Sequence, residues 1–274
     1  MSSASPSGGG FTLRQLVPNF CTFVAACSGL TSIRFAIDQE FEWALAAILF
    51  AVLLDGLDGH LARLLDAQSK FGAEFDSLAD FLSFGVAPAV LMFTWTLYGL
   101  NNIGWAVAVI FALACCLRLA RFNSMLGTQQ FAWQKDFFTG VPAPAGALLV
   151  LSPMYLAGIL TPASLEMKGL GLFPSGVWLI ALNTLAVAFL LVSTIPTYSA
   201  KIAVERALKE HLLPTLLLVA GLILILVTFP HATLMAVTVL YLCMIPWSVW
   251  RFRHLMAEEL DEEDDVHGPR NAHP

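Results

Sequence analysis

Apolar stretches of about twenty residues recur along the whole chain and are separated by short polar segments. A helix needs roughly 20 apolar residues to cross the hydrocarbon of a bilayer. The pattern therefore predicts eight spanning helices, near residues 16–37, 42–65, 72–98, 103–122, 138–160, 174–194, 211–229 and 231–250. The expected fold is all-α, a polytopic membrane bundle of about eight transmembrane helices with both termini on one side.

Composition points to the same class of protein. The chain is 58% hydrophobic and 12% charged, whereas soluble domains carry about 25% charged residues. An integral membrane protein is expected, with no nucleic-acid partner. The net charge of -6 is concentrated in the run EELDEEDD near the C-terminus. The chain thus divides into a flexible N-terminal segment 1–15, a membrane domain 16–254 and an acidic tail 255–274 that we expect to be disordered.

The basic residues predict the orientation, because cytoplasmic loops of membrane proteins carry an excess of Lys and Arg. With eight spans, one side holds only Arg34 and Lys168. The other side holds Arg14, Arg63, Lys70, Arg118, Arg121, Lys135, Lys201, Arg206, Lys209, Arg251 and Arg253. Both termini and the segment joining the second and third spans are therefore expected to face the cytoplasm.

Two pairs of carboxylates interrupt the apolar pattern between and inside the second and third spans. Asp55 and Asp58 are three residues apart, and Asp76 and Asp80 are four apart, so each pair shares one face of a helix. A carboxylate near the centre of a membrane helix costs roughly 2.5–3.5 kcal/mol on insertion scales. A hard divalent cation would offset this cost, since carboxylate and water ligands suit Mg²⁺, Mn²⁺ or Ca²⁺.

Chemistry alone leaves other interpretations open. The carboxylates could belong to an acidic turn between two spans. They could also mark an ion or proton pathway of a transporter, as acids inside membranes often do.

The spacing from Asp55 to Asp80 is D-x2-D-G-x2-A-R-x8-G-x3-D-x3-D. This pattern resembles the signature of the CDP-alcohol phosphotransferase family, and every position of the signature is present. Three further stretches resemble the phosphatidylserine synthase branch of that family: LVPNFCTFVAACSGL, CLRLARFN and FFTGVPAPAGA. Together with the aspartate signature, these stretches are spread over residues 16–147, about half of the chain.

The resemblance implies a role for each matching residue. Asp55, Asp58, Asp76 and Asp80 would bind two divalent cations, Mg²⁺ or Mn²⁺, with Ca²⁺ as a non-productive occupant. Asp80 would also act as the catalytic base. The CDP group would be bound by Gly59, Ala62, Arg63 and Gly72, and by Asn19 and Thr22 of the first span. For Asn19 and Thr22, hydrogen bonding between helices is an equally weighted alternative.

The expected reaction transfers the phosphatidyl group of CDP-diacylglycerol to L-serine and gives phosphatidylserine and CMP. Arg118 and Arg121 would bind the acceptor or a lipid phosphate, because a carboxylate or phosphate needs a cation. Alternatively, they only contribute to the excess of basic residues that orients the chain in the membrane. Direct attack of the serine hydroxyl is favoured, since the sequence shows no Ser, Cys or His nucleophile beside a base.

Three rival functions remain at this point. The same fold could use another acceptor, namely glycerol 3-phosphate, inositol phosphate, phosphatidylglycerol or choline. The chain could instead be an ion- or proton-coupled transporter, or a scaffold without activity. The resemblance further implies a homodimer among membrane lipids in a bacterial inner membrane, with the active site facing the cytoplasm.

Overall fold

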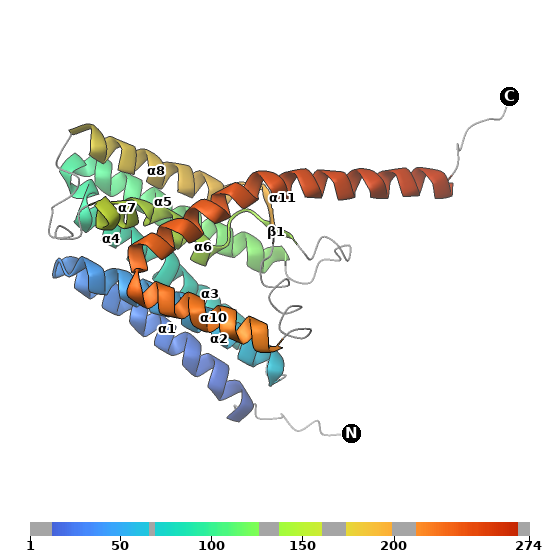
Figure 1. Cartoon of the computed structure of the whole chain (residues 1–274), viewed down its shortest axis with the longest axis horizontal. Helices are drawn as coiled ribbons and strands as arrows, with labels where there is room; N and C mark the ends of the chain where they lie inside the picture. The colour runs from blue at the N-terminus through green and yellow to red at the C-terminus, as the bar shows by residue number, and fades with distance from the viewer. Residues whose placement is uncertain (1–12, 66–68, 126–136, 161–173, 199–211, 268–274) are drawn as a thin grey trace, which may run out of the picture. The chain divides into compact units, whose positions relative to one another are not determined.

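The computed structural model describes residues 13–65, 69–125, 137–160, 174–198 and 212–267 (Figure 1). These residues fall into two compact units. The first unit runs to Leu119 and takes in α8 (Pro174–Val192) as far as Leu185. The second unit takes in the rest, from Ala120 to Met167 and from Ala186 onward.

The described helices of the first unit begin with a hairpin of two long helices. The elements of this unit are α1 (Leu13–Ile37), α2 (Phe41–Leu64), α3 (Lys70–Asp80), the π-helix η1 (Phe81–Val86), α4 (Ala87–Trp95), the 3-10 helix η2 (Leu97–Leu100), most of α5 (Asn102–Met125) and the first part of α8. The segments α3, η1 and α4 follow one another without a break and form one apolar span, Lys70–Trp95.

The turn between α1 and α2 is closed by hydrogen bonds that cap α1. Gln39 has a φ of 64°, and its N–H donates to the carbonyl of Ala36, while the N–H of Glu40 donates to that of Phe35. This is the pattern in which a left-handed residue satisfies the last carbonyls of a helix. It reverses the chain so that α2 lies beside α1 (Figure 1).

Small and hydroxyl-bearing residues bring the helices of the first unit close together. Ser28 and Ser32 of α1 donate to the carbonyls of Ala47 and Ala44 of α2, each at 2.8 Å. Hydroxyl groups and small residues commonly hold membrane helices together in this way, because lipid supplies no hydrophobic driving force between them. Within the same unit, Phe93 of α4 packs edge-on against Trp105 of α5.

The second unit contains the end of α5, a short two-stranded sheet and five further helical segments among its described residues. These are β1 (Phe137–Thr139), α6 (Ala143–Val150), α7 (Ser152–Leu160), the end of α8 (Pro174–Val192), β2 (Pro196–Tyr198), α10 (Leu212–Thr228) and α11 (Pro230–His267). The strands pair antiparallel, with Phe138 opposite Thr197. Helix α11 packs on α7, where Gly158 leaves room for the ring of His231.

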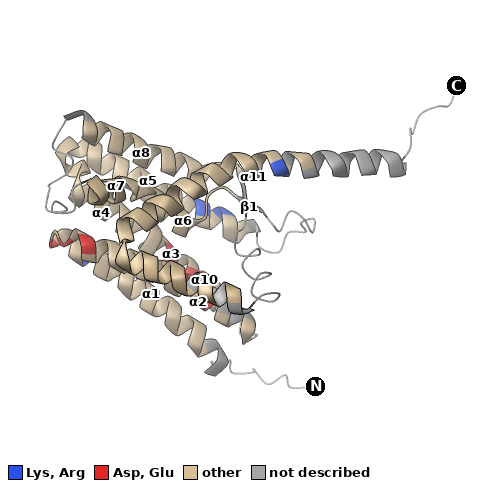
Figure 2. Ribbon diagram, in the orientation of Figure 1, with Lys and Arg blue, Asp and Glu red and all other residues tan. Residues whose placement is uncertain are grey.

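The helical fold class is confirmed, and each of the eight predicted stretches contains a helix. Five helices of the described chain are long and apolar enough to cross a membrane: Leu16–Ile37, Lys70–Trp95, Asn102–Ser124, Ala143–Leu160 and Pro230–Phe252. A shorter apolar helix covers Gly176–Val192. The chain is an integral membrane protein, and Figure 2 shows how few charges its described helices carry. The count of eight spans stays a prediction.

Two segments differ from the expectations. The predicted fifth span begins as strand β1 and an extended turn, because Gly140 has a φ of 80° and two prolines follow it. Helix α11 continues to His267, through the acidic run that we expected to be disordered. Residues 1–12 and 268–274 lie outside the described part of the chain.

Candidate metal and substrate site

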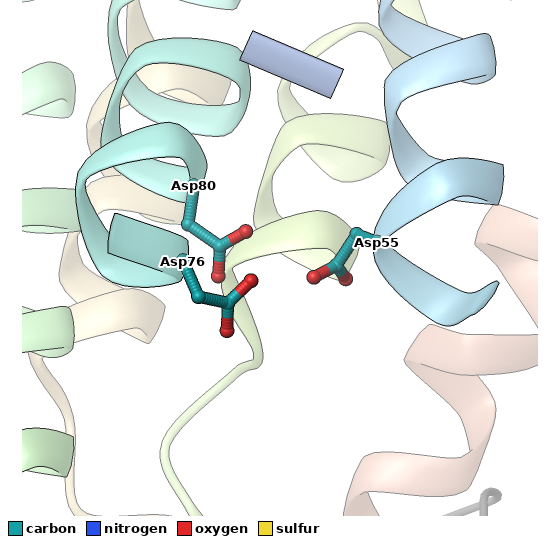
Figure 3. A group of neighbouring side chains, drawn as sticks. All are labelled: Asp55, Asp76 and Asp80. Carbon is teal, nitrogen blue, oxygen red and sulfur yellow. The ribbon is translucent and has the colours of Figure 1, made fainter. Parts of the chain in front are cut away.

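Three of the four predicted carboxylates meet within the first unit. Asp55 comes from α2, and Asp76 and Asp80 come from α3. One carboxylate oxygen of each lies within 4.8 Å of the others, and all three residues are half-buried. Figure 3 shows the side chains of the two α3 residues and of Asp55 pointing toward one another. Because Asp76 and Asp80 are one helical turn apart, a single face of α3 presents both to α2.

This donor set fits a hard divalent cation. The three carboxylates supply oxygen ligands alone, which suit Mg²⁺, Mn²⁺ or Ca²⁺ and not zinc. Like charges this close repel one another, so a cation between them would stabilise the arrangement. The geometry of the carboxylates therefore agrees with the metal site predicted from the spacing.

Asp58, the fourth predicted ligand, lies outside this group of three among the described residues. Its carboxylate is buried, with 5% of the residue exposed, and its Oδ2 accepts a hydrogen bond of 2.7 Å from the hydroxyl of Thr22 on α1. The structure thus brings Asp55, Asp76 and Asp80 together and turns one oxygen of Asp58 toward α1.

The start of α3 packs against α1 beside these carboxylates. Ser69 caps α3 by accepting the N–H of Gly72 at 3.0 Å. A Cβ added at Gly72 would lie 3.0 Å from the Asn19 side-chain oxygen and 3.0 Å from the Ser69 hydroxyl oxygen. A side chain at Gly72 would crowd Asn19 and Ser69, so the glycine favours the close approach of α3 to α1, and Asn19 borders the same corner of the first unit.

The remaining predicted CDP-binding residues lie on α2. The helix continues through Gly59, Ala62 and Arg63 to Leu64, one to two turns beyond Asp55. The side chains of Ala62 and Arg63 are outside what the structure describes. Their roles stay predictions that rest on their matches to the signature.

The two arginines of α5 have different surroundings. Arg118 is close enough to Asp80 for their charges to interact. Arg121 belongs to the second unit, where its Nη1 donates to the carbonyl oxygens of Val192 at 2.7 Å and Ser193 at 3.3 Å. These carbonyls lie at the end of α8, where a helix leaves its last carbonyls without partners in the helix. Arg121 therefore caps α8 by donating hydrogen bonds to them. The pair that the sequence treated alike thus separates into a cation near the carboxylates and a helix cap.

Two features near the site were not predicted. The π-helix η1 begins directly after Asp80, and π-helical turns are frequent at functional sites. Its Ser83 donates to the carbonyl of Ala25 on α1 at 3.1 Å, at a point where α1 carries Gly29. In the sequence, the glycine at position 29 is the one sign that η1 approaches α1 closely here, and nothing in the sequence marks the π-helix.

Comparisons with known proteins identify a family and several relatives of this chain. A model of the CDP-alcohol phosphatidyltransferase family matches residues 15–175. The chain is 37% identical over 262 residues to the CDP-diacylglycerol–serine O-phosphatidyltransferase of Mycobacterium tuberculosis H37Rv, covering 94% of this chain and 86% of that protein.

Two further relatives match over about half of the chain. The protein of the same name from Helicobacter pylori 26695 is 41% identical over 136 residues, which are 50% of this chain and 56% of the relative. The archaetidylserine synthase of Methanothermobacter thermautotrophicus is 36% identical over 151 residues, 54% of this chain and 61% of the relative. The chain belongs to the CDP-alcohol phosphatidyltransferase family.

Proposed function

We propose that this protein transfers the phosphatidyl group of CDP-diacylglycerol to L-serine and releases CMP. The observation that carries the proposal is the meeting of Asp55, Asp76 and Asp80 within 4.8 Å in a family whose similar members bear the name of that activity. Arg118 beside Asp80 adds a cation suited to the carboxylate of serine.

The carboxylates would hold two divalent cations, Mg²⁺ or Mn²⁺. When bound, the cations would neutralise the pyrophosphate and the charge that develops on the leaving CMP. Asp55 and Asp58 would hold them from α2, and Asp76 and Asp80 from α3. Gly59, Ala62, Arg63 and Gly72 would form the CDP site beside them, together with Asn19.

Asp80 would act as the base on the acceptor. Its carboxylate would take the proton of the serine hydroxyl as the serine oxygen forms its bond to the phosphorus of the phosphatidyl group. The bond from that phosphorus to the CMP oxygen then breaks, and CMP leaves with the electron pair. The step is balanced: the proton of serine ends on Asp80, and the new bond from phosphorus to serine replaces the bond from phosphorus to CMP.

In this proposal the site faces the cytoplasm. The sequence puts most Lys and Arg on the side of the carboxylates, and the excess of such residues marks the cytoplasmic face. The lipid tails of the donor would stay in the bilayer while its headgroup enters the site. A bacterial inner membrane and a homodimer are expected from the family resemblance.

The test measures CMP release by the purified protein in detergent with CDP-diacylglycerol and Mg²⁺ or Mn²⁺. L-Serine is compared with glycerol 3-phosphate, inositol phosphate, phosphatidylglycerol and choline. We expect release with serine and recovery of phosphatidylserine as the lipid product. Release with a different acceptor alone would retain the family chemistry and overturn the choice of serine.

A second experiment tests direct displacement. The protein is incubated with CDP-diacylglycerol and metal in the absence of serine, and then examined by intact-protein mass spectrometry. No added phosphatidyl mass is expected. A covalent phosphatidyl-enzyme would overturn direct attack. If folded protein releases no CMP with any acceptor, ion flux in liposomes tests the transporter alternative.

A further inference from the structure

The hydrogen bond between Thr22 and Asp58 joins α1 to α2 beside the carboxylate group. The Thr22 hydroxyl lies 2.7 Å from Asp58 Oδ2, within the range of strong bonds from hydroxyls to carboxylates. The same hydroxyl oxygen lies 3.1 Å from the carbonyl oxygen of Pro18. A hydroxyl has one proton, so the shorter, charge-assisted contact with Asp58 takes precedence.

Burial limits what else Thr22 can do. Thr22 and Asp58 are each 5% exposed in the first unit. A nucleotide would have little access to a side chain so covered, and the hydroxyl proton is already directed at a carboxylate. Both observations weigh against the contact between Thr22 and CDP that the sequence suggested.

The hydrogen bond orients the carboxylate of Asp58. Fixing Oδ2 toward α1 fixes the plane of the carboxylate, and so the direction of its other oxygen. Asp58 lies on the same face of α2 as Asp55, one turn further along the helix. Groups that hydrogen-bond to a metal-binding carboxylate commonly fix its orientation, and removing them weakens metal binding.

We propose that Thr22 is a positioning residue that holds Asp58 in place as the fourth carboxylate of the metal site. This inference rests on the proposed function, because it assumes that the carboxylates bind divalent cations. It assigns Thr22 to the metal side of the site and leaves Asn19, which lies at Gly72, as the first-span residue beside the CDP group.

The experiment measures Mn²⁺ binding to the full-length protein in detergent, without substrate, by electron paramagnetic resonance of free Mn²⁺. Thr22→Val removes the hydroxyl and keeps the shape, and Thr22→Ser keeps the hydroxyl. The matched control is Thr31→Val on the same helix, whose hydroxyl donates to its own helix at the carbonyl of Cys27 at 2.7 Å. Thermal unfolding is recorded for every variant.

We expect Thr22→Val to weaken Mn²⁺ binding about 10- to 100-fold, while Thr22→Ser and Thr31→Val stay close to the parent protein. In steady-state assays Thr22→Val should raise the Mn²⁺ concentration needed for half-maximal activity and leave the KM for CDP-diacylglycerol unchanged. In an Asp58→Asn background, Thr22→Val should have no further effect on Mn²⁺ binding.

Unchanged Mn²⁺ binding in Thr22→Val, with a raised KM for CDP-diacylglycerol, would overturn the inference and make Thr22 a nucleotide contact. If Thr22→Val does not fold, the comparison passes to Thr22→Ser and Thr22→Ala, and equal Mn²⁺ binding by these two would overturn it as well. Failure of the parent protein to bind Mn²⁺ would instead refute the proposed metal site, so the two failures are distinguishable.

Discussion

The crossing of α1 over the π-helix η1 predicts a strong effect of Gly29→Ala. A Cβ at this position would lie 2.6 Å from Ser83 Oγ and 2.9 Å from Ser83 Cα. Carbon atoms in favourable contact are about 3.5–4.0 Å apart, so α1 and η1 must separate by about 0.5–1 Å. The backbone contact cannot be relieved by rotating the Ser83 side chain.

The cost of that separation follows from two terms. Extra carbon atoms in a packed interior typically cost about 1–3 kcal/mol, and the Ser83 hydrogen bond to Ala25, of 3.1 Å, would be lengthened or lost. We therefore expect the melting temperature in detergent to fall by about 2–10 °C. Ser83 follows Asp80 by three residues, so the shift should also displace Asp80 and reduce kcat more than the KM for CDP-diacylglycerol.

The assay pairs thermal unfolding with CMP release. Gly221→Ala on α10 is the control, because a Cβ there meets nothing within 4 Å. This control should leave both quantities unchanged or raise stability slightly. Adding Ser83→Ala to Gly29→Ala removes the nearest clashing atom and should recover part of the stability. An unchanged melting temperature and kcat in Gly29→Ala would refute the reasoning, since the crossing would then not fix the position of Asp80.

The remaining predictions concern the arginines, the base and the metal. Arg118→Gln should raise the KM for serine by about tenfold or more, as expected for loss of a hydrogen bond to a charged group, with little change in melting temperature. Arg121→Gln should leave the KM for serine nearly unchanged and lower the stability by about 1.5–3 kcal/mol, because α8 loses its charge-assisted cap. An equal rise of the KM for serine in both variants would contradict these separate roles. Asp80→Asn should lower kcat by about 10²–10⁴-fold in protein that still unfolds cooperatively, and a loss below tenfold would exclude it as the base. Chelation should abolish CMP release, with recovery on adding Mg²⁺ or Mn²⁺ and none with Ca²⁺; full activity in chelator would contradict a metal site.

The helices could be predicted from the sequence because hydropathy over about twenty residues is enough to place a span. The end of α11 could not be predicted in this way. The acidic run was interpreted as disordered, yet it directly continues a helix, and elongating an existing helix is far easier than starting one. Glu, Leu, Met and Ala in this segment also favour the helical state.

The candidate site was predictable where one helix face carries it. Asp76 and Asp80 share a face at four-residue spacing, and the structure brings them to Asp55. The orientation of Asp58 toward Thr22 depends on how α2 packs against α1, so it could not be predicted from the spacing of the carboxylates. Arg118 and Arg121 are likewise equivalent in sequence pattern, and it is the charge of Asp80 near Arg118 and the carbonyl bound by Arg121 that distinguish them.

The central claim is that the carboxylates of α2 and α3 support metal-dependent transfer of a phosphatidyl group to serine. The most direct measurement follows CMP release from CDP-diacylglycerol by metal-free protein as Mn²⁺ is added back, with and without L-serine, for the parent protein and Asp80→Asn. The account predicts release that requires both Mn²⁺ and serine and is nearly absent in Asp80→Asn. Release that is independent of serine, or equal in the two proteins, would contradict it.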